Sequence, residues 1–256
     1  MSVKPTLIAL VIASGAGLSS AQAEAVKIGI AAEPYPAFAS PEASGSYSGW
    51  EIDLIHAVCA KAEMDCEIVP TSWDGLIPSL PSQKIDVIAA SMGINAERLK
   101  VIDFSNKYYQ TDAGILAAQG AGILPTAEGL AGKTLAVQAA SIHQAYARKH
   151  FPEVETRVYA TYDEATQDLF AGRVDAVMAD VLSNARFLAS DEGAACCEDT
   201  GTVEYDVVIH GPGIGFGLRK GDPLKDKLNA AIEDIRHDGS YAEFTAKYFP
   251  FDIFGD

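Results

Sequence analysis

An arginine that follows an apolar stretch of the sequence is the first candidate for a ligand-binding residue. Arg98 follows Gly93 and Asn95, where a run of small apolar residues ends. Asn95 is a favourable N-cap, so we predict a helix from Ala96 with Arg98 as its third residue. Free backbone N–H groups and a planar guanidinium would then meet at one place and suit a carboxylate. The alternative is an ordinary surface arginine in a first helical turn.

An aspartate at the end of a second apolar stretch offers the opposite charge. Asp180 ends the sequence RVDAVMAD, and a buried carboxylate is costly unless it has a partner. It would either cap the helix predicted to follow it or accept an ammonium group from a ligand. Arg98 and Asp180 together would complement a zwitterion.

Aromatic residues and a further carboxylate precede several predicted helices. Tyr35 lies with Glu33 in a proline-interrupted loop, while Trp50 and Trp73 each stand at the start of a helix. Such rings can stack on a ligand or hold a cation, although any one of them is more often part of a core. Glu33 would contact a distal positive group or remain a solvated carboxylate. The backbone N–H of Ser141 would bind a carboxylate, or Ser141 is a plain N-cap.

Strands and helices are predicted to alternate in the order βαβαβ, twice over, which indicates an α/β fold with parallel strands. Residues 71–91 align without gaps on residues 160–180, so that Ser91 and Asp180 both follow a strand. Ligands bind at the carboxyl ends of strands in open α/β sheets. The predicted strands span 25–31, 66–70, 84–91, 133–138, 154–160 and 173–180, and the helices 50–63, 73–80, 142–150 and 162–172.

The C-terminal part is expected to return to the first unit. A glycine-rich strand follows residue 210, and two helices complete the chain. The chain would then cross between two lobes near Gln110–Asp112 and near Gly211–Ile214, and two crossings form a hinge. We therefore predict lobe 1 from residues 24–110 and 214–256, and lobe 2 from residues 111–213.

The N-terminus and the charge indicate an exported protein. Residues 1–23 combine Lys4, an apolar run and a small-residue site at Ala21–Ala23, which is typical of a signal peptide. A retained N-terminal anchor is the alternative. The net charge of −16 over 256 residues disfavours binding to nucleic acid or to anionic lipid.

Four cysteines in an exported chain predict disulfide bonds. Cys59 and Cys66 cannot bond within one helix, but they can if the helix ends near Glu63 and Cys66 begins the next strand. Cys196 and Cys197 are adjacent, and we weakly favour a vicinal disulfide over two free thiols. No common catalytic or phosphate-binding motif is present in the sequence.

The whole predicted mature chain resembles periplasmic solute-binding proteins of polar amino acid ABC transporters. The resemblance is carried by GWEIDL, WDGLIPSL, KIDVIAASMGINAER, AGRVDAVMAD, GIGFGLRK and KYFPFDIFG, and by Cys59 and Cys66. It is closest to the histidine and lysine/arginine/ornithine binders and to the nopaline and octopine binders. It implies a two-lobed Venus-flytrap fold, an amino acid ligand, a membrane permease as partner, a monomer and no cofactor.

The resemblance also implies roles for individual residues. Arg98 would hold the α-carboxylate of the ligand, and Asp180 its α-ammonium. Trp50 would stack on the ligand side chain, and Cys59–Cys66 matches a disulfide of the histidine-type binders. The other residues expected at the ligand are Glu33, Tyr35, Trp73, Ala90, Ser91, Met92, Gly93, Ser141 and Ile142.

Departures from the pattern leave alternatives open. The amino acid binders usually carry a serine at the position of Gly93, and a glycine there, with Glu33 and Trp73, is similar to the opine binders. Cyclohexadienyl dehydratases resemble this fold and use a cleft carboxylate as general acid, but both zwitterion contacts, Arg98 and Asp180, favour binding over catalysis. A receptor sensor domain is disfavoured because no membrane helix or kinase follows. We expect a polar, cationic amino acid or an N-substituted derivative as ligand.

Overall fold

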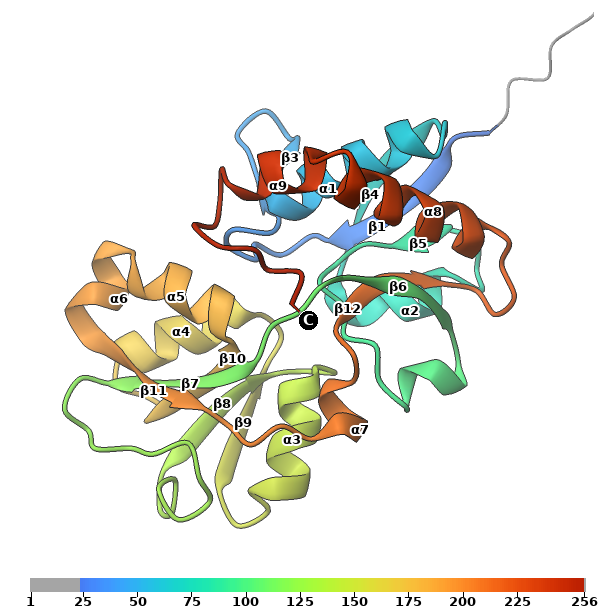
Figure 1. Cartoon of the computed structure of the whole chain (residues 1–256). Coiled ribbons are helices and arrows are strands. Elements are labelled where there is room, and N and C mark those ends of the chain that lie inside the picture. Colours follow the sequence, from blue (N-terminus) through green and yellow to red (C-terminus); the bar gives the residue numbers. More distant parts are fainter. Residues whose placement is uncertain (1–23, 256) are drawn as a thin grey trace, which may run out of the picture.

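Two five-stranded sheets organise the chain, in a computed structural model that describes residues 24–255 (Figure 1). In the first sheet, β4, β1 and β5 run parallel and β12 is antiparallel to both of its neighbours. The strands, in spatial order, are β4 (Cys66–Thr71), β1 (Val26–Ala31), β5 (Val87–Ile88), β12 (Ile214–Leu218) and β6 (Asp103–Tyr109). With its helices this sheet forms lobe 1.

The second sheet has the same mixture of directions and forms lobe 2. Strands β10, β8 and β9 are parallel, and β7 is antiparallel to β10 and β11. In spatial order they are β11 (Cys197–Thr202), β7 (Ala113–Ala118), β10 (Ala176–Asp180), β8 (Thr134–Gln138) and β9 (Glu155–Tyr159). The predicted parallel units are thus present, each extended by antiparallel strands.

Helices from both ends of the chain cover lobe 1 (Figure 1). The C-terminal helices α8 (Leu224–His237) and α9 (Ser240–Thr245) pack against α1 (Trp50–Lys61). Short helices η1 (Trp73–Gly75) and α2 (Leu76–Ser79) follow β4, and a small hairpin of β2 (Ser40–Pro41) and β3 (Tyr47–Ser48) precedes α1. The aromatic core of this lobe lies between α1, α9 and the sheet.

Alternate residues of the second sheet pack on helices at opposite faces. Leu135 and Val137 belong to a cluster with Tyr146 of α3, whereas Ala136 packs with Tyr162 of α4. This is the period of two expected for a strand buried on both faces. The helices of lobe 2 are α3 (Ile142–His150), α4 (Tyr162–Phe170), α5 (Val181–Leu188), α6 (Asp191–Cys196) and α7 (Val207–His210).

The chain passes twice between the sheets, near the two predicted crossings. It leaves β6 at Tyr109 and enters β7 at Ala113, then leaves α7 at His210 and enters β12 at Ile214. Gly211 has a φ of +64°, and a Cβ atom there would lie 1.6 Å from a backbone oxygen of lobe 1. The second crossing therefore requires glycine. The residue limits predicted for the lobes stay a prediction.

Both cysteine pairs are bonded in the structure. Cys59 near the end of α1 pairs with Cys66 at the start of β4, which confirms the predicted arrangement. Cys196 and Cys197 also pair with each other. The predicted signal peptide lies outside the described residues. Within residues 24–255 no helix has the length and apolar character needed to cross a membrane.

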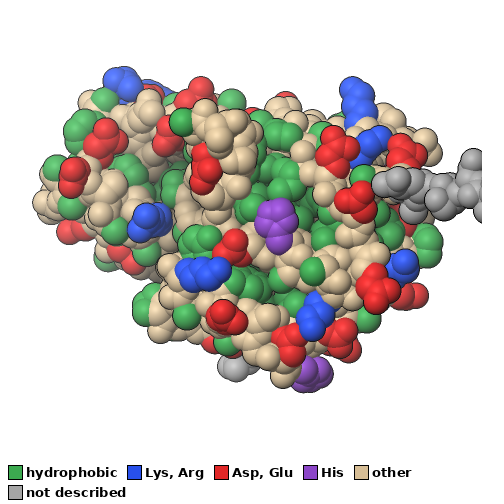
Figure 2. All heavy atoms as spheres, turned by 90° about the horizontal axis from the view of Figure 1, so that it is seen from above, with side chains coloured by type: hydrophobic (Ala, Val, Ile, Leu, Met, Phe, Trp, Pro, Cys, Tyr) green, Lys and Arg blue, Asp and Glu red, His purple; other side chains and the backbone are tan. Residues whose placement is uncertain are grey.

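Charges of both signs are spread over one face of the molecule. Figure 2 shows the molecule from above, where acidic side chains lie interspersed with lysine and arginine rather than apart from them. Charges of both signs spread over a surface favour solubility and create no broad basic field on this face.

Candidate functional site

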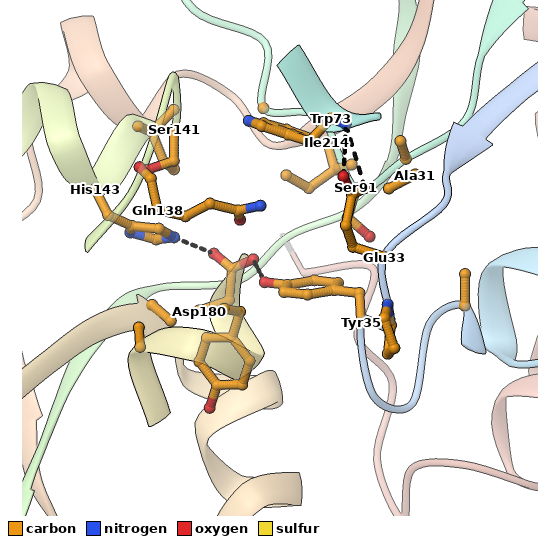
Figure 3. A pocket seen from close by; sticks show the side chains of 18 of the residues that line it. Ala31, Glu33, Tyr35, Trp73, Ser91, Gln138, Ser141, His143, Asp180 and Ile214 are labelled. Atoms are coloured by element: carbon orange, nitrogen blue, oxygen red, sulfur yellow. Dashed lines mark hydrogen bonds and ion pairs between the residues drawn. The ribbon is translucent and has the colours of Figure 1, made fainter. Parts of the chain in front are cut away.

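A cavity between the two lobes brings together most of the residues predicted to bind a ligand (Figure 3). It contains about 840 Å³ of space free of protein atoms, its open mouth included. Ten of the twelve predicted residues line it: Glu33, Tyr35, Trp73, Ala90, Ser91, Gly93, Arg98, Ser141, Ile142 and Asp180.

Arg98 connects the two lobes at one side of the cavity. Its side chain is 8 % exposed, and its guanidinium donates to the backbone oxygens of Gly93 in lobe 1 (2.8 Å) and Ala140 in lobe 2 (3.1 Å). The same group lies 5.4 Å from the ring centroid of Trp73. Burial lowers the pKa of Arg98 to about 10, and Asp180 opposes this effect. The group therefore stays cationic at neutral pH.

The local structure around Arg98 corrects one prediction. No α-helix begins at Ala96; a single 3-10 turn, η2, covers Arg98–Lys100. Asn95 does accept a hydrogen bond from the backbone of Arg98, at 2.9 Å. Strand β6 begins at Asp103, so the chain has room for one turn only. An anion at this place would be bound by the guanidinium, not by a helix dipole.

Asp180 ends β10 and is turned into the cavity. It occupies the N-cap position of α5, but its side chain makes no capping hydrogen bond. One carboxylate oxygen accepts a hydrogen bond from the Tyr35 hydroxyl of lobe 1, and the other lies 3.5 Å from Nε2 of His143 (Figure 3). Burial, and next the nearby carboxylate, raise the pKa of Tyr35, so its hydroxyl keeps its proton. The capping alternative considered for Asp180 is therefore wrong.

A buried glutamate holds Ser91 in place. Ser91 has a φ of +51°, which is unfavourable for a residue with a side chain. Glu51 accepts hydrogen bonds from the backbone N–H of Ser91 (2.7 Å) and from its hydroxyl (3.1 Å). The Tyr108 hydroxyl donates to the same carboxylate. Burial raises the pKa of Glu51, and these three donors oppose the shift.

Glu33 and Trp73 are hydrogen-bonded to each other in the upper part of the cavity as drawn in Figure 3. The Glu33 carboxylate accepts hydrogen bonds from the backbone N–H of Trp73 at 3.2 and 3.4 Å. The indole N–H of Trp73 donates to the backbone oxygen of Ala139 in lobe 2 at 3.0 Å. Glu33 is thus neither a free loop carboxylate nor far from the cavity, and Trp73 spans the two lobes.

The remaining predicted residues of lobe 2 occupy the turn after β8. Ser141 caps α3 by accepting a hydrogen bond from the backbone of Gln144 at 3.1 Å. Ile142 faces Gly93 of lobe 1: a Cβ atom added to Gly93 would meet the Ile142 side chain at 3.5 Å. Both residues line the cavity, so Ser141 serves as an N-cap at the edge of the site.

Two predicted site residues lie elsewhere, and we correct them. Trp50 is 0 % exposed and packs in the aromatic core of lobe 1, where its indole N–H donates to Thr245 at 2.9 Å. Met92 is 1 % exposed and belongs to the core beneath α2. Ser91 and Gly93 line the cavity, whereas Met92 between them packs into that core.

Several lining residues were not predicted. They include Glu51 of α1, Gln138 at the end of β8, His143 of α3 and Tyr162 of α4. Glu51 carried a signal, because an acidic residue among apolar neighbours in a helix must either face solvent or have partners. His143 lies two positions after the predicted site residue Ser141.

The charges that line the cavity would suit a zwitterion that carries an additional positive group. Its ionisable lining in the described residues consists of three carboxylates and one guanidinium, together with His143 and two tyrosines. Arg98 offers donors for a carboxylate, and Asp180 offers acceptors for an ammonium group. The arrangement can bind a small polar molecule and hold the lobes together around it.

Known proteins share this sequence pattern over almost the whole chain. A profile of the bacterial extracellular solute-binding proteins, family 3, matches residues 26–251. The chain belongs to this family. Among family 3 relatives, the L-arginine-binding protein of Pseudomonas aeruginosa is 38 % identical over 234 residues, covering 90 % of each chain. The lysine/arginine/ornithine-binding periplasmic protein of Escherichia coli is 36 % identical over 99 % of this chain and 100 % of its own.

A solved structure extends the comparison to the fold. An ancestral amino acid-binding protein, described as a precursor of cyclohexadienyl dehydratase, superposes with a TM-score of 0.77 at 29 % identity, over 88 % of this chain and 95 % of that one. The predicted two-lobed α/β fold, the periplasmic location and the family are confirmed. As a family 3 member, the protein is a solute-binding protein.

Proposed function

We propose that this protein binds a cationic amino acid between its lobes and delivers it to the permease of an ABC importer. The observation that carries the proposal is the placement of Arg98 and Asp180. Both are buried, they come from different lobes, and both line the same cavity. An α-carboxylate at Arg98 and an α-ammonium at Asp180 would each gain a charged partner out of water.

The charge of the cavity favours a ligand with an additional positive group. Three lining carboxylates, Glu33, Glu51 and Asp180, outnumber the guanidinium of Arg98. A neutral zwitterion would leave this excess uncompensated, whereas arginine, lysine or ornithine would reduce it. The names of the two relatives, an L-arginine binder and a lysine/arginine/ornithine binder, support the same class.

Contacts across the cavity support capture by closure. Tyr35, Trp73 and Arg98 of lobe 1 donate hydrogen bonds to Asp180, Ala139 and Ala140 of lobe 2, respectively. A ligand that touches both lobes interacts more strongly with this arrangement than with separated lobes. The ligand therefore increases the population of the closed conformation. A permease can distinguish this conformation from the open one.

An opine, which carries a substituent on the α-nitrogen, is a second candidate ligand. The observation behind it is Gly93, which has no side chain where it faces Arg98 and Ile142. A Cβ atom there would make only ordinary contacts of 3.5 Å, so the glycine is not needed for the fold. A ligand substituent could use the room beside the guanidinium that a side chain at position 93 would take up.

We propose binding without catalysis, although one structural relative is described as a precursor of an enzyme. A dehydratase needs a cavity carboxyl group that can donate a proton. Both oxygens of Glu51 already accept hydrogen bonds from Ser91, and one also accepts from Tyr108. Asp180 likewise has partners at both oxygens. Glu33 accepts from the backbone N–H of Trp73 at both oxygens, so none of the three carboxylates is placed as a free acid.

The test is calorimetric titration of the refolded mature protein with the twenty amino acids, ornithine, octopine, nopaline and prephenate. We expect the tightest binding for arginine, lysine or ornithine. Asp180→Asn should weaken that binding strongly, because the ammonium would lose its charged partner. Asp191→Asn, at an exposed helix start, is the matched control and should bind like the wild type.

The panel also contains the outcomes against the proposal. Binding to the opines alone would replace the cationic amino acid with an N-substituted one. Turnover of prephenate without amino acid binding would overturn the whole function.

A further inference from the structure

Two buried histidines of lobe 2 have nitrogen atoms without a hydrogen-bond partner among the described residues. These atoms are Nδ1 of His143 and Nε2 of His210. We propose that His143 and His210 are positioning residues that form a relay, Asp180–His143–His210. This relay would fix the acceptor for the ligand ammonium and connect it to the second crossing between the lobes. The inference rests on the proposed function, because it assigns the support of the same site.

The surroundings of His143 determine which of its nitrogens carries the proton. Nε2 lies 3.5 Å from a carboxylate oxygen of Asp180. A ring nitrogen that faces a carboxylate is favoured in its protonated form, since a lone pair there would be repelled. Nδ1 of His143 is then an acceptor. The side chain is 8 % exposed, so an unused acceptor would be costly.

His210 has the complementary arrangement. Its Nδ1 accepts a hydrogen bond from the backbone N–H of Asp206 at 2.9 Å, so the neutral ring carries its proton on Nε2. Burial, followed by the neighbouring His143, lowers the pKa of His210, which keeps the ring neutral at physiological pH. Nε2 of His210 is therefore a buried donor that needs an acceptor.

The rings of His143 and His210 lie on neighbouring helices of lobe 2. Helix α3 packs on α7, and the His210 ring is 5.2 Å from that of Tyr146, one helical turn after His143. A donor and an acceptor, both buried and both lacking a partner among the described residues, would then satisfy one another through one bridging water.

The relay would have two effects on binding. It would hold the His143 ring in place, so that the free oxygen lone pairs of Asp180 point to the ammonium position. It would also tie Asp180 to α7, which ends at His210, directly before Gly211 and the crossing into lobe 1. A ligand that binds to Asp180 would thereby influence the second crossing, where the backbone must rotate when the lobes move.

The first experiment reads the tautomers directly and needs no ligand. The mature protein, labelled with ¹⁵N in its histidine rings, is studied by long-range ¹H–¹⁵N correlation at pH 7.5, with His143→Gln and His210→Gln used for assignment. We expect both rings to be neutral with the proton on Nε2. A proton on Nδ1 of His143, or a doubly protonated His210, would overturn the relay.

The second experiment measures the effect on affinity, with L-arginine as the probe. His210 does not line the cavity, yet His210→Ala should raise the Kd about fivefold. His210→Gln, which restores an N–H donor at about the same position, should return the Kd to within twofold of the wild type. The control is His56→Ala, which removes an exposed histidine of α1 that does not line the cavity.

The outcomes separate the inference from the proposed function. Equal Kd values for His210→Ala and His56→Ala would contradict the relay even if the tautomers agree. If no amino acid binds, the proposed function fails, while the tautomers still decide whether the relay exists.

Discussion

The hydroxyl of Tyr35, in the loop after β1, donates a hydrogen bond to the carboxylate of Asp180 at the end of β10. This contact joins the two lobes through the group that we expect to hold the ligand ammonium. It occupies one oxygen of Asp180 and leaves the lone pairs of the other exposed to the cavity beside His143. Tyr35 thus contributes both to closure and to the polarity of the site.

Removal of this hydroxyl should weaken binding. In Tyr35→Phe the ring still packs on Phe38 and Tyr162, but the closed state loses a hydrogen bond to a charged group, worth ~1.5 kcal/mol. We expect the Kd for L-arginine to rise about tenfold. Calorimetric titration measures it, and Tyr47→Phe, which removes a hydroxyl bonded within lobe 1, is the control. An unchanged Kd would contradict a contribution of this contact to the ligand-bound state.

Loss of the guanidinium should have a larger effect. Arg98→Ala leaves the ligand carboxylate without a charged partner and also removes a bond to lobe 2. A penalty of at least ~2 kcal/mol, or about a 30-fold rise in Kd, is expected. Lys100→Ala lies in the same turn, is exposed and pairs only with Glu97 among the described residues, so it should bind normally. Wild-type affinity in Arg98→Ala would place the carboxylate elsewhere.

Glu51 should leave a pH signature on stability. Its folded-state pKa is raised by burial from an ordinary value of 4.5, so its contribution is fully present below that unfolded value and is lost as pH rises through the folded value. Glu51→Gln removes this dependence. The free energy of unfolding of Glu51→Gln, minus that of the wild type, should therefore be larger at pH 7 than at pH 4. Urea unfolding at both pH values measures the difference, and a constant difference would contradict the raised pKa.

The two disulfides should differ in their effect on stability. Cys59 and Cys66 are seven positions apart, and closing a loop of this length contributes ~2.5 kcal/mol by restricting the unfolded chain. We expect the double variant Cys59→Ala/Cys66→Ala to lose about this amount in urea unfolding. The bond between Cys196 and Cys197 closes no loop beyond neighbouring residues, so Cys196→Ala/Cys197→Ala should lose much less. The reverse order would show that native packing around Cys196 dominates.

Sequence patterns predicted much of the architecture because they depend on local periodicity. The helix over Ile142–His150 and the aspartate that ends β10 both follow from alternation of apolar residues and from caps. These patterns could not distinguish Trp50 from Trp73, since each stands at the start of a helix. Only the packing of α9 on α1 decides that Trp50 is core.

Other features of the site depend on contacts between distant parts of the chain. The turn at Arg98 is short because β6 must join the sheet at Asp103, a tertiary requirement that overrides a good N-cap. Glu51 reaches Ser91 across 40 residues of sequence, and His143 meets Asp180 only after β8 and β10 pair. No local pattern predicts such meetings.

The turn of Ala139 and Ala140 has a practical consequence. It receives the bonds from Trp73 and Arg98 at backbone oxygens, not at side chains, and the Ala140 side chain is exposed. Substitution there can therefore alter the surface while the lobe-closing atoms are kept. A fluorophore attached at position 140 would sit beside the mouth of the cavity, which makes this turn a natural place to convert the protein into an optical sensor for its ligand.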